Sequence, residues 1–332
     1  MKRLVFYVFA ILLLWASMAS GGMKKGSIVM DFKIHSGKGQ HTQLWIPYPL
    51  SDDFQRISDV RIKGNYGRFG IYREPVSGAI YLYAEWNNST DVPELRFHFN
   101  AETKERSVKE MKESGNIPVE VRRYMKGNRF VPTDGRIREV AEQIIRGKKR
   151  ILEKARAVYD WVVENTYRDP NVRGCGRGIV EETLARRSGK CADISSVFVA
   201  LARAAGVPAR EVFGLRLAKE AEKDMTGGYH CWAEFYLPGT GWVPVDPADV
   251  RKVMLVKKLS LKEAEPYREY FFGKVDEFRI VLERGGRGVT LDPPASEPLN
   301  YFMYPYGEVN GKPLDYLDPK NFSYSIHFKE IK

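Results

Sequence analysis

Apolar and polar residues alternate along the first third of the chain, which is the period of a half-buried β-strand. Turn-rich segments separate four such runs, and several short strands at this spacing predict a β-sandwich over residues 22–105. The apolar positions of the runs are Ile28, Met30, Phe32 and Ile34, then Leu44 and Ile46, then Ile80, Leu82, Ala84 and Trp86, and finally Leu95, Phe97 and Phe99.

The apolar period changes to that of a helix after a charged linker, residues 106–134. Pro170 stops the second of the helices that this period predicts, and Gly206 with Pro208 ends the fourth, the usual order at a helix C-terminus. The predicted helices cover residues 137–145, 152–163, 180–187 and 191–205.

A period of two returns after the helices and predicts three strands, at residues 212–217, 230–237 and 242–246. The sequence Pro-Gly-Thr-Gly at positions 238–241 joins the last two strands as a hairpin. Helices followed by an antiparallel sheet indicate an α+β core. We expect this core to occupy residues 135–292.

The remaining residues, 293–332, are expected to form a C-terminal extension. It begins with a proline-rich loop and ends with a closing strand. The apolar residues that share one face of that strand are Phe322, Tyr324, Ile326 and Phe328.

The N-terminus has the composition of a secretory signal peptide, residues 1–21. Lys2 and Arg3 precede an apolar run from Leu4 to Trp15, and small residues follow it. A membrane span needs roughly 20 apolar residues, so this run favours a cleaved signal over the alternative, an uncleaved anchor. We therefore expect an exported protein, periplasmic or extracellular, with no integral membrane span after the signal is removed.

The net charge of +11 falls to +9 once Lys2 and Arg3 leave with the signal. A basic surface is compatible with an anionic partner such as a cell-wall polymer or a lipid head group, and equally with a well-solvated surface. No basic stripe interleaved with aromatic residues and no nucleic-acid motif occurs. Nucleic acid is therefore not an expected partner.

The chain has three cysteines, Cys175, Cys191 and Cys231. An odd number in an oxidising compartment leaves at least one thiol outside any internal disulfide. Cys191 follows Gly189 and opens a predicted helix, where the helix dipole lowers the pKa of a thiol. The alternative is that Cys191 is a small buried apolar residue.

His230 and Asp246 can lie next to each other on the predicted hairpin. If Tyr236 pairs with Trp242, Asp246 is diagonal to His230 on one face of the sheet, and a slip of one residue would separate them. The alternatives are a structural histidine and an aspartate that caps the next helix. Together Cys191, His230 and Asp246 supply a nucleophile, a base and an orienting carboxylate, and the N–H of Cys191 can donate to an oxyanion.

Four blocks around these residues resemble the transglutaminase-like superfamily: Gly189–Asp193, Leu201–Arg210, His230–Glu234 and Gly241–Pro247. The likeness is densest over residues 135–250. It implies a papain-like fold with a Cys-His-Asp triad, matched by Cys191, His230 and Asp246. It also implies a thioester intermediate in a peptidase, an amidase or a transglutaminase-type acyltransferase.

The resemblance extends to the N-terminal region, which is similar to the β-sandwich that often precedes this domain in exported bacterial members. It names no side chain of the oxyanion hole, for which Tyr167 and Trp232 are the candidates. The expected partner is a peptide or protein substrate, and an envelope peptide is compatible with export.

Two other functions compete with catalysis. One is a metal site made by the three cysteines and His230, although residues 230 and 231 point to opposite faces of a strand and no C-x-x-C pair occurs. The other is a non-catalytic binding module on the same scaffold. A disulfide between Cys175 and Cys231 would leave Cys191 free. Since no calcium-binding loop is present, we expect no cofactor and no required metal.

Overall fold

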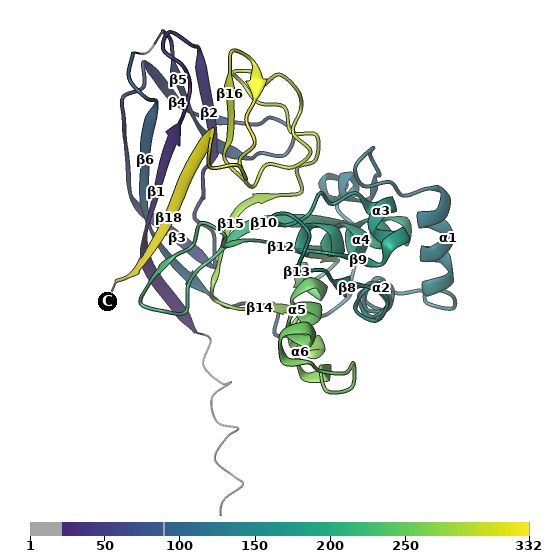
Figure 1. Cartoon of the computed structure of the whole chain (residues 1–332). Coiled ribbons are helices and arrows are strands. Elements are labelled where there is room, and N and C mark those ends of the chain that lie inside the picture. The colour runs from purple at the N-terminus through teal and green to yellow at the C-terminus, as the bar shows by residue number, and fades with distance from the viewer. Residues whose placement is uncertain (1–21, 89, 332) are drawn as a thin grey trace, which may run out of the picture.

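The computed structural model of the chain describes residues 22–88 and 90–331, so the signal peptide predicted over residues 1–21 lies outside the described residues. Figure 1 shows two lobes, a β-sandwich and a sheet covered by helices. Within the described part of the chain, no helix is long and apolar enough to cross a membrane. The antiparallel sheets and helices confirm the α+β fold predicted from the sequence.

Two antiparallel five-stranded sheets form the sandwich, with the orders β11-β18-β1-β6-β3 and β17-β16-β2-β5-β4. Alternation places Ile28 and Phe97 of the first sheet and Leu44 and Leu82 of the second in one buried core. The strands of the first sheet are β1 (Met23–Ile34), β3 (Gln55–Gly64), β6 (Glu94–Lys104), β11 (Glu222–Asp224) and β18 (Phe322–Glu330). Those of the second are β2 (Thr42–Pro47), β4 (Arg68–Arg73), β5 (Ile80–Trp86), β16 (Tyr306–Val309) and β17 (Lys312–Pro313).

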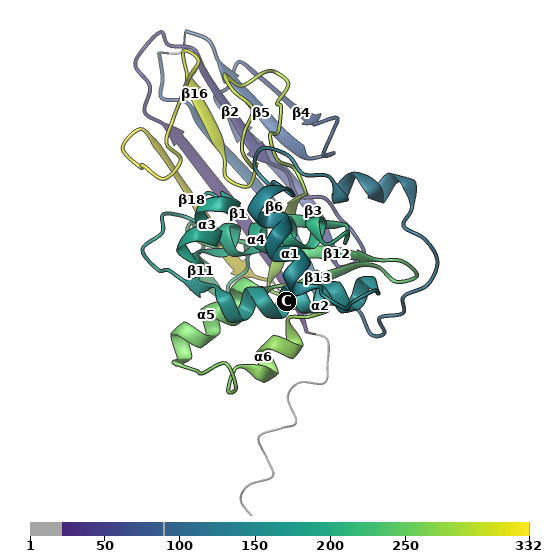
Figure 2. The same cartoon turned by 90° about the vertical axis from the view of Figure 1, so that its right-hand side faces the viewer.

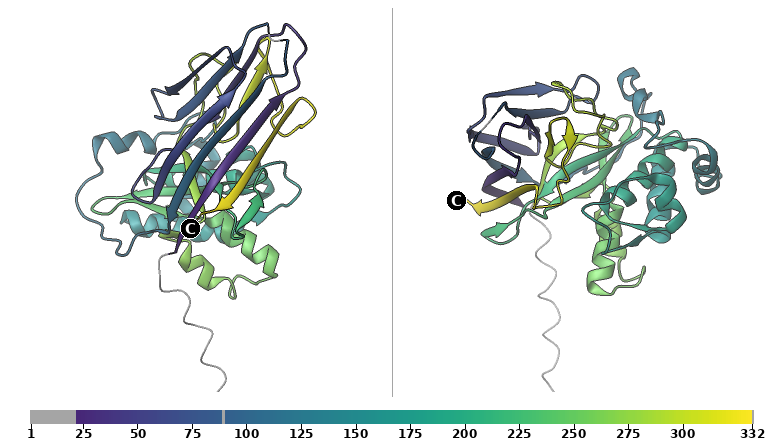
Figure 3. Two further views of the ribbon diagram at one scale, coloured as in Figure 1. Left: turned by 90° about the vertical axis from the view of Figure 1, so that its left-hand side faces the viewer. Right: turned by 45° about the horizontal axis from the view of Figure 1, so that its top comes forward.

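The first and the last strand of the described residues pair in the sandwich. Strand β18 pairs with β1 from Gly26 opposite Glu330 to Ile34 opposite Phe322, and Figure 3 shows the yellow C-terminal strand beside the purple N-terminal one. Strand β16 pairs with β2 in the other sheet. The sandwich therefore extends beyond residues 22–105, and the strands β16, β17 and β18 of the predicted C-terminal extension belong to it. Pairing between opposite ends of the chain leaves no local pattern, so the sequence did not predict it.

The sequence pattern also misses the strands β3 and β4. Both lie at the edge of a sheet. Apolar residues of β4 such as Phe69 and Ile71 are about half exposed. A strand that is only weakly buried carries little alternation, which is why neither strand stands out in the sequence.

The second lobe packs helices against a four-stranded sheet of order β13-β12-β10-β15. Figure 2 shows this lobe from its helical side, with the sandwich behind it. The sheet strands are β10 (Ala209–Arg216), β12 (Tyr229–Leu237), β13 (Gly241–Val245) and β15 (Arg279–Arg284). The helices are α1 (Gly135–Ile144), α2 (Ile151–Asn165), α3 (Val180–Arg186), α4 (Cys191–Ala204), α5 (Pro247–Lys257) and α6 (Glu265–Tyr270).

Short elements connect the main helices and strands of the second lobe. A parallel pair, β8 (Tyr167–Arg168) and β9 (Ser188–Gly189), leads into α4. The predicted linker holds β7 (Arg106–Ser107), which pairs with β14 (Lys274–Val275), and a 3-10 helix, Val119–Met125. The pairing of β7 with β14 thus fixes the linker to the second lobe.

The hairpin register matches the prediction. Tyr236 lies opposite Trp242, and Ala233 lies opposite Val245. Asp246 follows directly as the N-cap of α5. The register therefore carries Asp246 toward His230.

Replacing Ile326 by alanine should destabilise the protein by about 2–5 kcal/mol, because the side chain is fully buried between the sheets. Urea unfolding measures the change. His327→Ala, an exposed position on the same strand, should change stability by less than about 0.5 kcal/mol. Equal effects of the two substitutions would contradict the assignment of the buried face of β18.

Candidate active site

Cys191 lies in the first turn of α4, directly after its N-cap, Lys190. Its side chain is 2% exposed. The carboxylate of Asp193 holds this helix start, since it accepts hydrogen bonds from the N–H of Lys190 at 2.9 Å and of Gly178 at 2.8 Å. Helix α4 thus begins at a fixed point, with Cys191 at its tip.

Two glycines let the neighbouring backbone approach Asp193. A Cβ atom at Gly176 or at Gly189 would collide with the Asp193 side chain, and Gly176 has a φ of +92°. The carbonyl of Cys175 accepts a hydrogen bond of 2.9 Å from the N–H of the residue after Cys191. This loop therefore brings Cys175 next to Cys191.

His230 and Asp246 form a buried hydrogen-bonded pair. The Nε2 atom of His230 donates to Oδ2 of Asp246 at 2.8 Å. The side chains of His230 and Asp246 are 5% and 0% exposed. The other carboxylate oxygen of Asp246 accepts the N–H of Asp249 at 2.8 Å. Because Nε2 is bonded to Asp246, Nδ1 is the ring nitrogen available to the Cys191 thiol. The structure thus brings together the three residues selected from the sequence.

A buried arginine, Arg279, which no motif in the sequence predicts, binds the same carboxylate. The guanidinium of Arg279 donates to Oδ2 of Asp246, to Oδ2 of Asp249 at 2.8 Å and to Oδ2 of Asp276 at 2.9 Å. It also lies over the indole ring of Trp232, 5.3 Å from its centroid. Asp249 is three residues after Asp246, a spacing visible in the sequence. Nothing local connects either residue to Arg279 on β15.

The charges around His230 favour its protonated form. Burial alone lowers the pKa of His230, but the carboxylates of Asp249 and Asp246 more than offset it and raise this pKa above its ordinary value. The charges of Arg216, His230 and Arg279 hold the pKa of Asp249 far below its usual range, against its burial. The site therefore favours an imidazolium beside the ionised carboxylate of Asp249.

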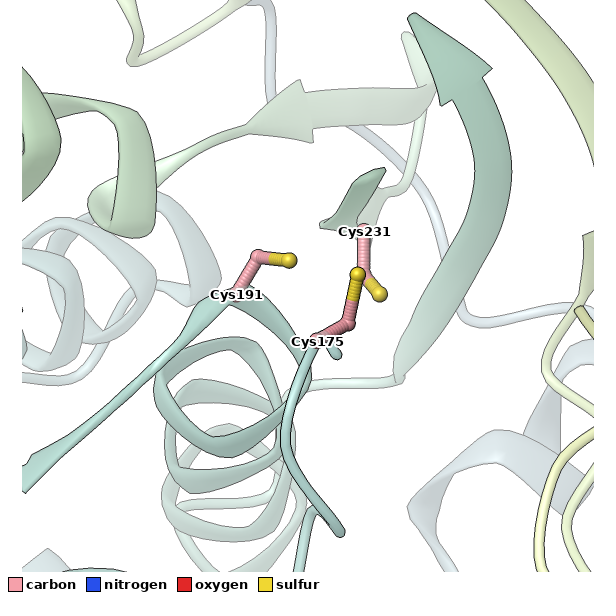
Figure 4. A group of neighbouring side chains, drawn as sticks. All are labelled: Cys175, Cys191 and Cys231. Carbon is pink, nitrogen blue, oxygen red and sulfur yellow. The ribbon is translucent and has the colours of Figure 1, made fainter. Parts of the chain in front are cut away.

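The three cysteines form one cluster of free thiols, shown in Figure 4. Their Sγ atoms all lie within 4.8 Å of one another. The Cys175 thiol donates to the carbonyl of Tyr229 at 3.2 Å, and the Cys231 thiol lies 3.6 Å from Sδ of Met303. The Cys175–Cys231 disulfide considered from the sequence is not formed.

The cluster acts on the ionisation of Cys191. The thiols of Cys175 and Cys231 lower the pKa of Cys191 most, burial raises it, and the His230 imidazole lowers it further. The net result is a pKa well below the ordinary value. The pKa of Cys231 is raised instead, first by burial and then by the other two thiols. Cys191 is therefore the thiol that ionises.

The three thiols also constitute the candidate metal ligands. Alternation along the strand predicts that Cys231 points away from His230, but the Cys231 sulfur lies within 4.8 Å of those of Cys175 and Cys191. The Nε2 atom of His230 is bonded to Asp246, which leaves only Nδ1 for a metal. His230, Asp246 and Asp249 form a second close group of potential ligands. The positive charge of Arg279 on this group disfavours a cation there.

Donors for an oxyanion are present at the helix tip. The N–H of Cys191 is at a position that no intrahelical carbonyl satisfies. Of the two side chains considered from the sequence, Trp232 is buried with its Nε1 atom unpartnered among the described residues. Tyr167 is 55% exposed and stacks with Arg251.

Replacing Cys175 by alanine should raise the pKa of Cys191, because the Cys175 thiol lowers it most. The thiolate exists above the pKa, so the pH at which half of Cys191 is alkylated should move up toward the ordinary thiol value of about 8.5. Alkylation read by peptide mass spectrometry measures this midpoint. Ser195→Ala, on the same helix and with no hydrogen bond to lose, should not move it. An unchanged midpoint in Cys175→Ala would contradict the thiol–thiol interaction.

Replacing Arg279 by methionine should destabilise the protein by about 3–5 kcal/mol, since it leaves buried carboxylates without their counter-charge. Chemical denaturation at neutral pH measures the loss. Arg61→Met removes an arginine that is 65% exposed and paired with Asp59, and it should change stability by less than about 1 kcal/mol. If Arg279→Met were as stable as wild type, the carboxylates would not depend on this arginine.

Comparisons with known proteins show the family of this chain. The model of the transglutaminase-like superfamily matches residues 138–247. An uncharacterised protein of Haemophilus influenzae is 38% identical to this chain. The match covers 91% of this chain and 89% of that protein. A protein-glutamine gamma-glutamyltransferase of Pseudomonas aeruginosa is 35% identical over 78 residues, 21% of this chain and 11% of that protein.

The fold is also found in a solved structure, a candidate cysteine protease of Cytophaga hutchinsonii. The TM-score is 0.56 at 16% identity, and the match covers 93% of this chain and 98% of the other. The similarity therefore includes both lobes. On its sequence and its fold, this chain belongs to the transglutaminase-like superfamily.

Proposed function

We propose that this protein is an exported thiol enzyme that cleaves or exchanges amide bonds. Cys191 is the nucleophile, His230 the acid and base, and Asp246 the residue that orients the imidazole. The observation that carries the proposal is the buried His230–Asp246 hydrogen bond beside a thiol whose pKa is lowered. A histidine with a purely structural role would not require a thiol of lowered pKa next to its second ring nitrogen.

The reaction follows from the positions of these groups. The Cys191 thiolate attacks the amide carbon, so a C–S bond forms and the carbonyl oxygen becomes an oxyanion near the tip of α4. The imidazolium of His230 gives its Nδ1 proton to the leaving nitrogen, and the C–N bond breaks. The product is a thioester on Cys191.

The acceptor decides between hydrolysis and transfer. Neutral His230 takes a proton from water or from an amine, which attacks the thioester and releases Cys191. Water gives a peptidase or amidase. An amine gives acyl transfer, the activity named for the Pseudomonas aeruginosa relative.

Soft-metal binding is the second candidate function. It is favoured by the three Sγ atoms within 4.8 Å of one another, since thiolates and thioethers select soft metals. Metal analysis of the purified protein separates the two functions. A stoichiometric metal that blocks alkylation of all three cysteines would favour the binding function over catalysis.

The catalytic function is tested by capturing the thioester. The protein is mixed with a peptide library that includes cell-envelope peptides, quenched in acid and analysed by peptide mass spectrometry. Acylation at Cys191 is expected, and an added primary amine should divert product from acid to amide if the enzyme transfers acyl groups.

Cys191→Ala and His230→Gln should each lower turnover by roughly a thousandfold or more. When catalytic residues act as a unit, the loss of one removes most of the rate acceleration that the unit provides. Ser195→Ala is the matched control and should retain turnover. Turnover by Cys191→Ala at the wild-type rate, or the absence of an acyl-enzyme with every peptide tried, would refute the proposal.

A further inference from the structure

A basic cavity of about 700 Å³ lies beside the proposed triad. Its walls include His230 and Cys175, two of the three side chains that interact with the Cys191 thiol. Cavities of this size accommodate small ligands or parts of a peptide. The cavity is thus in the right place to hold the part of a substrate next to the reacting amide.

The charge of the cavity wall is strongly positive. The wall has two acidic residues: Glu220 is paired with Lys223, and Asp224 accepts the N–H of Thr226 at 2.8 Å. Arg216 is paired with Asp249 and Asp276. The basic residues of the wall are Arg168, Lys190, Arg216, Lys219, Lys223 and Lys252.

Four of these cations form no ion pair with the residues that the structure describes. One of them, Lys219, lies over the ring of Phe278, and the other three are Arg168, Lys190 and Lys252. They come from separate elements, namely β8, the N-cap of α4 and the helix α5. The Nη1 atom of Arg168 is buried and has no hydrogen-bond partner in the described chain. An unsatisfied buried guanidinium nitrogen is unfavourable, so it points to a missing acceptor.

The ionisation of Lys252 is affected by the positive charges around it. Burial lowers the pKa of Lys252 most. The charges of Arg216 and Arg168 lower it further, and those of Asp249 and Cys191 offset only part of this effect. Like charges held together in a partly buried site repel one another, and a bound anion would remove that repulsion. An anion in the cavity that Arg168, Lys190 and Lys252 line would relieve this repulsion.

We propose that Arg168, Lys190 and Lys252 bind a carboxylate of the acyl donor, so that the substrate is an acidic peptide. This rests on the proposed function, because it takes Cys191 as the residue that attacks the acyl donor. A carboxylate is the anion that a peptide itself supplies, and guanidinium and ammonium groups bind it through charge-assisted hydrogen bonds.

The test compares two alkylating agents at Cys191. Iodoacetate carries a carboxylate and iodoacetamide is its neutral amide; in both cases the thiolate displaces iodide and a C–S bond forms. The ratio of the two rate constants is measured by mass spectrometry in the native protein and again in urea, which gives the intrinsic ratio. The native ratio should exceed the intrinsic one, and the excess should shrink at high salt.

Lys252→Gln, Lys190→Gln and Arg168→Gln should each lower the native ratio by roughly fivefold, the effect of one unit charge at about 4 Å in water. Lys257→Gln removes the same charge from an exposed position of α5 outside the cavity, and it should leave the ratio unchanged. Three separate variants keep the test decisive if one of them fails to fold.

The outcomes separate this proposal from the proposed function. If iodoacetamide labels Cys191 rapidly but the native and intrinsic ratios are equal, the carboxylate site is refuted and the nucleophile stands. If both rate constants fall in parallel in the variants, the cations stabilise the thiolate and bind no substrate anion, which also refutes the site. If neither agent labels Cys191, both proposals fail.

Discussion

The carboxylate of Asp246, which has no exposed surface, is the group on which the arrangement of the site depends. A buried charge is tolerated only when it is paired and hydrogen-bonded, and here the partners are His230, Arg279 and the first turn of α5. Each partner comes from a different element, β12, β15 and α5. The hydrogen bonds of one side chain therefore fix where three segments meet.

This constraint extends from stability to chemistry. Asp246 holds the Nε2 atom of His230, so the imidazole presents Nδ1 to the tip of α4. On the other side of the sulfur, Asp193 and the glycines around it fix the helix start and the loop of Cys175. The Cys191 side chain thus lies between the hydrogen-bonded His230–Asp246 pair and the thiols of Cys175 and Cys231. A cation-lined cavity lies next to this packing, with His230 and Cys175 in its wall.

The sequence predicts the parts of this site that depend on local structure. The hairpin register follows from a four-residue turn and an alternating pattern, so Asp246 could be placed near His230. The position of Cys191 follows from the start of its helix. Arg279, the loop of Cys175 and the strand β18 depend on contacts between distant segments, which leave no periodic signal. The convergence of the three thiols is the clearest case. Alternation on β12 predicts that Cys231 points away from the face on which His230 meets Cys191, yet all three sulfur atoms lie close together.

The central claim is that His230 is held as an imidazolium between carboxylates and beside the Cys191 thiolate. It is tested most directly by nuclear magnetic resonance of the His230 ring nitrogens, followed as pH rises through the ordinary imidazole pKa of about 6.5. The account predicts that Nε2 stays protonated throughout and that Nδ1 loses its proton only above that value. The stability that this protonation contributes is then complete at pH below about 6.5 and is lost as pH rises through the folded-state pKa. A ring that is already neutral below about pH 6.5 in the native protein would contradict the account.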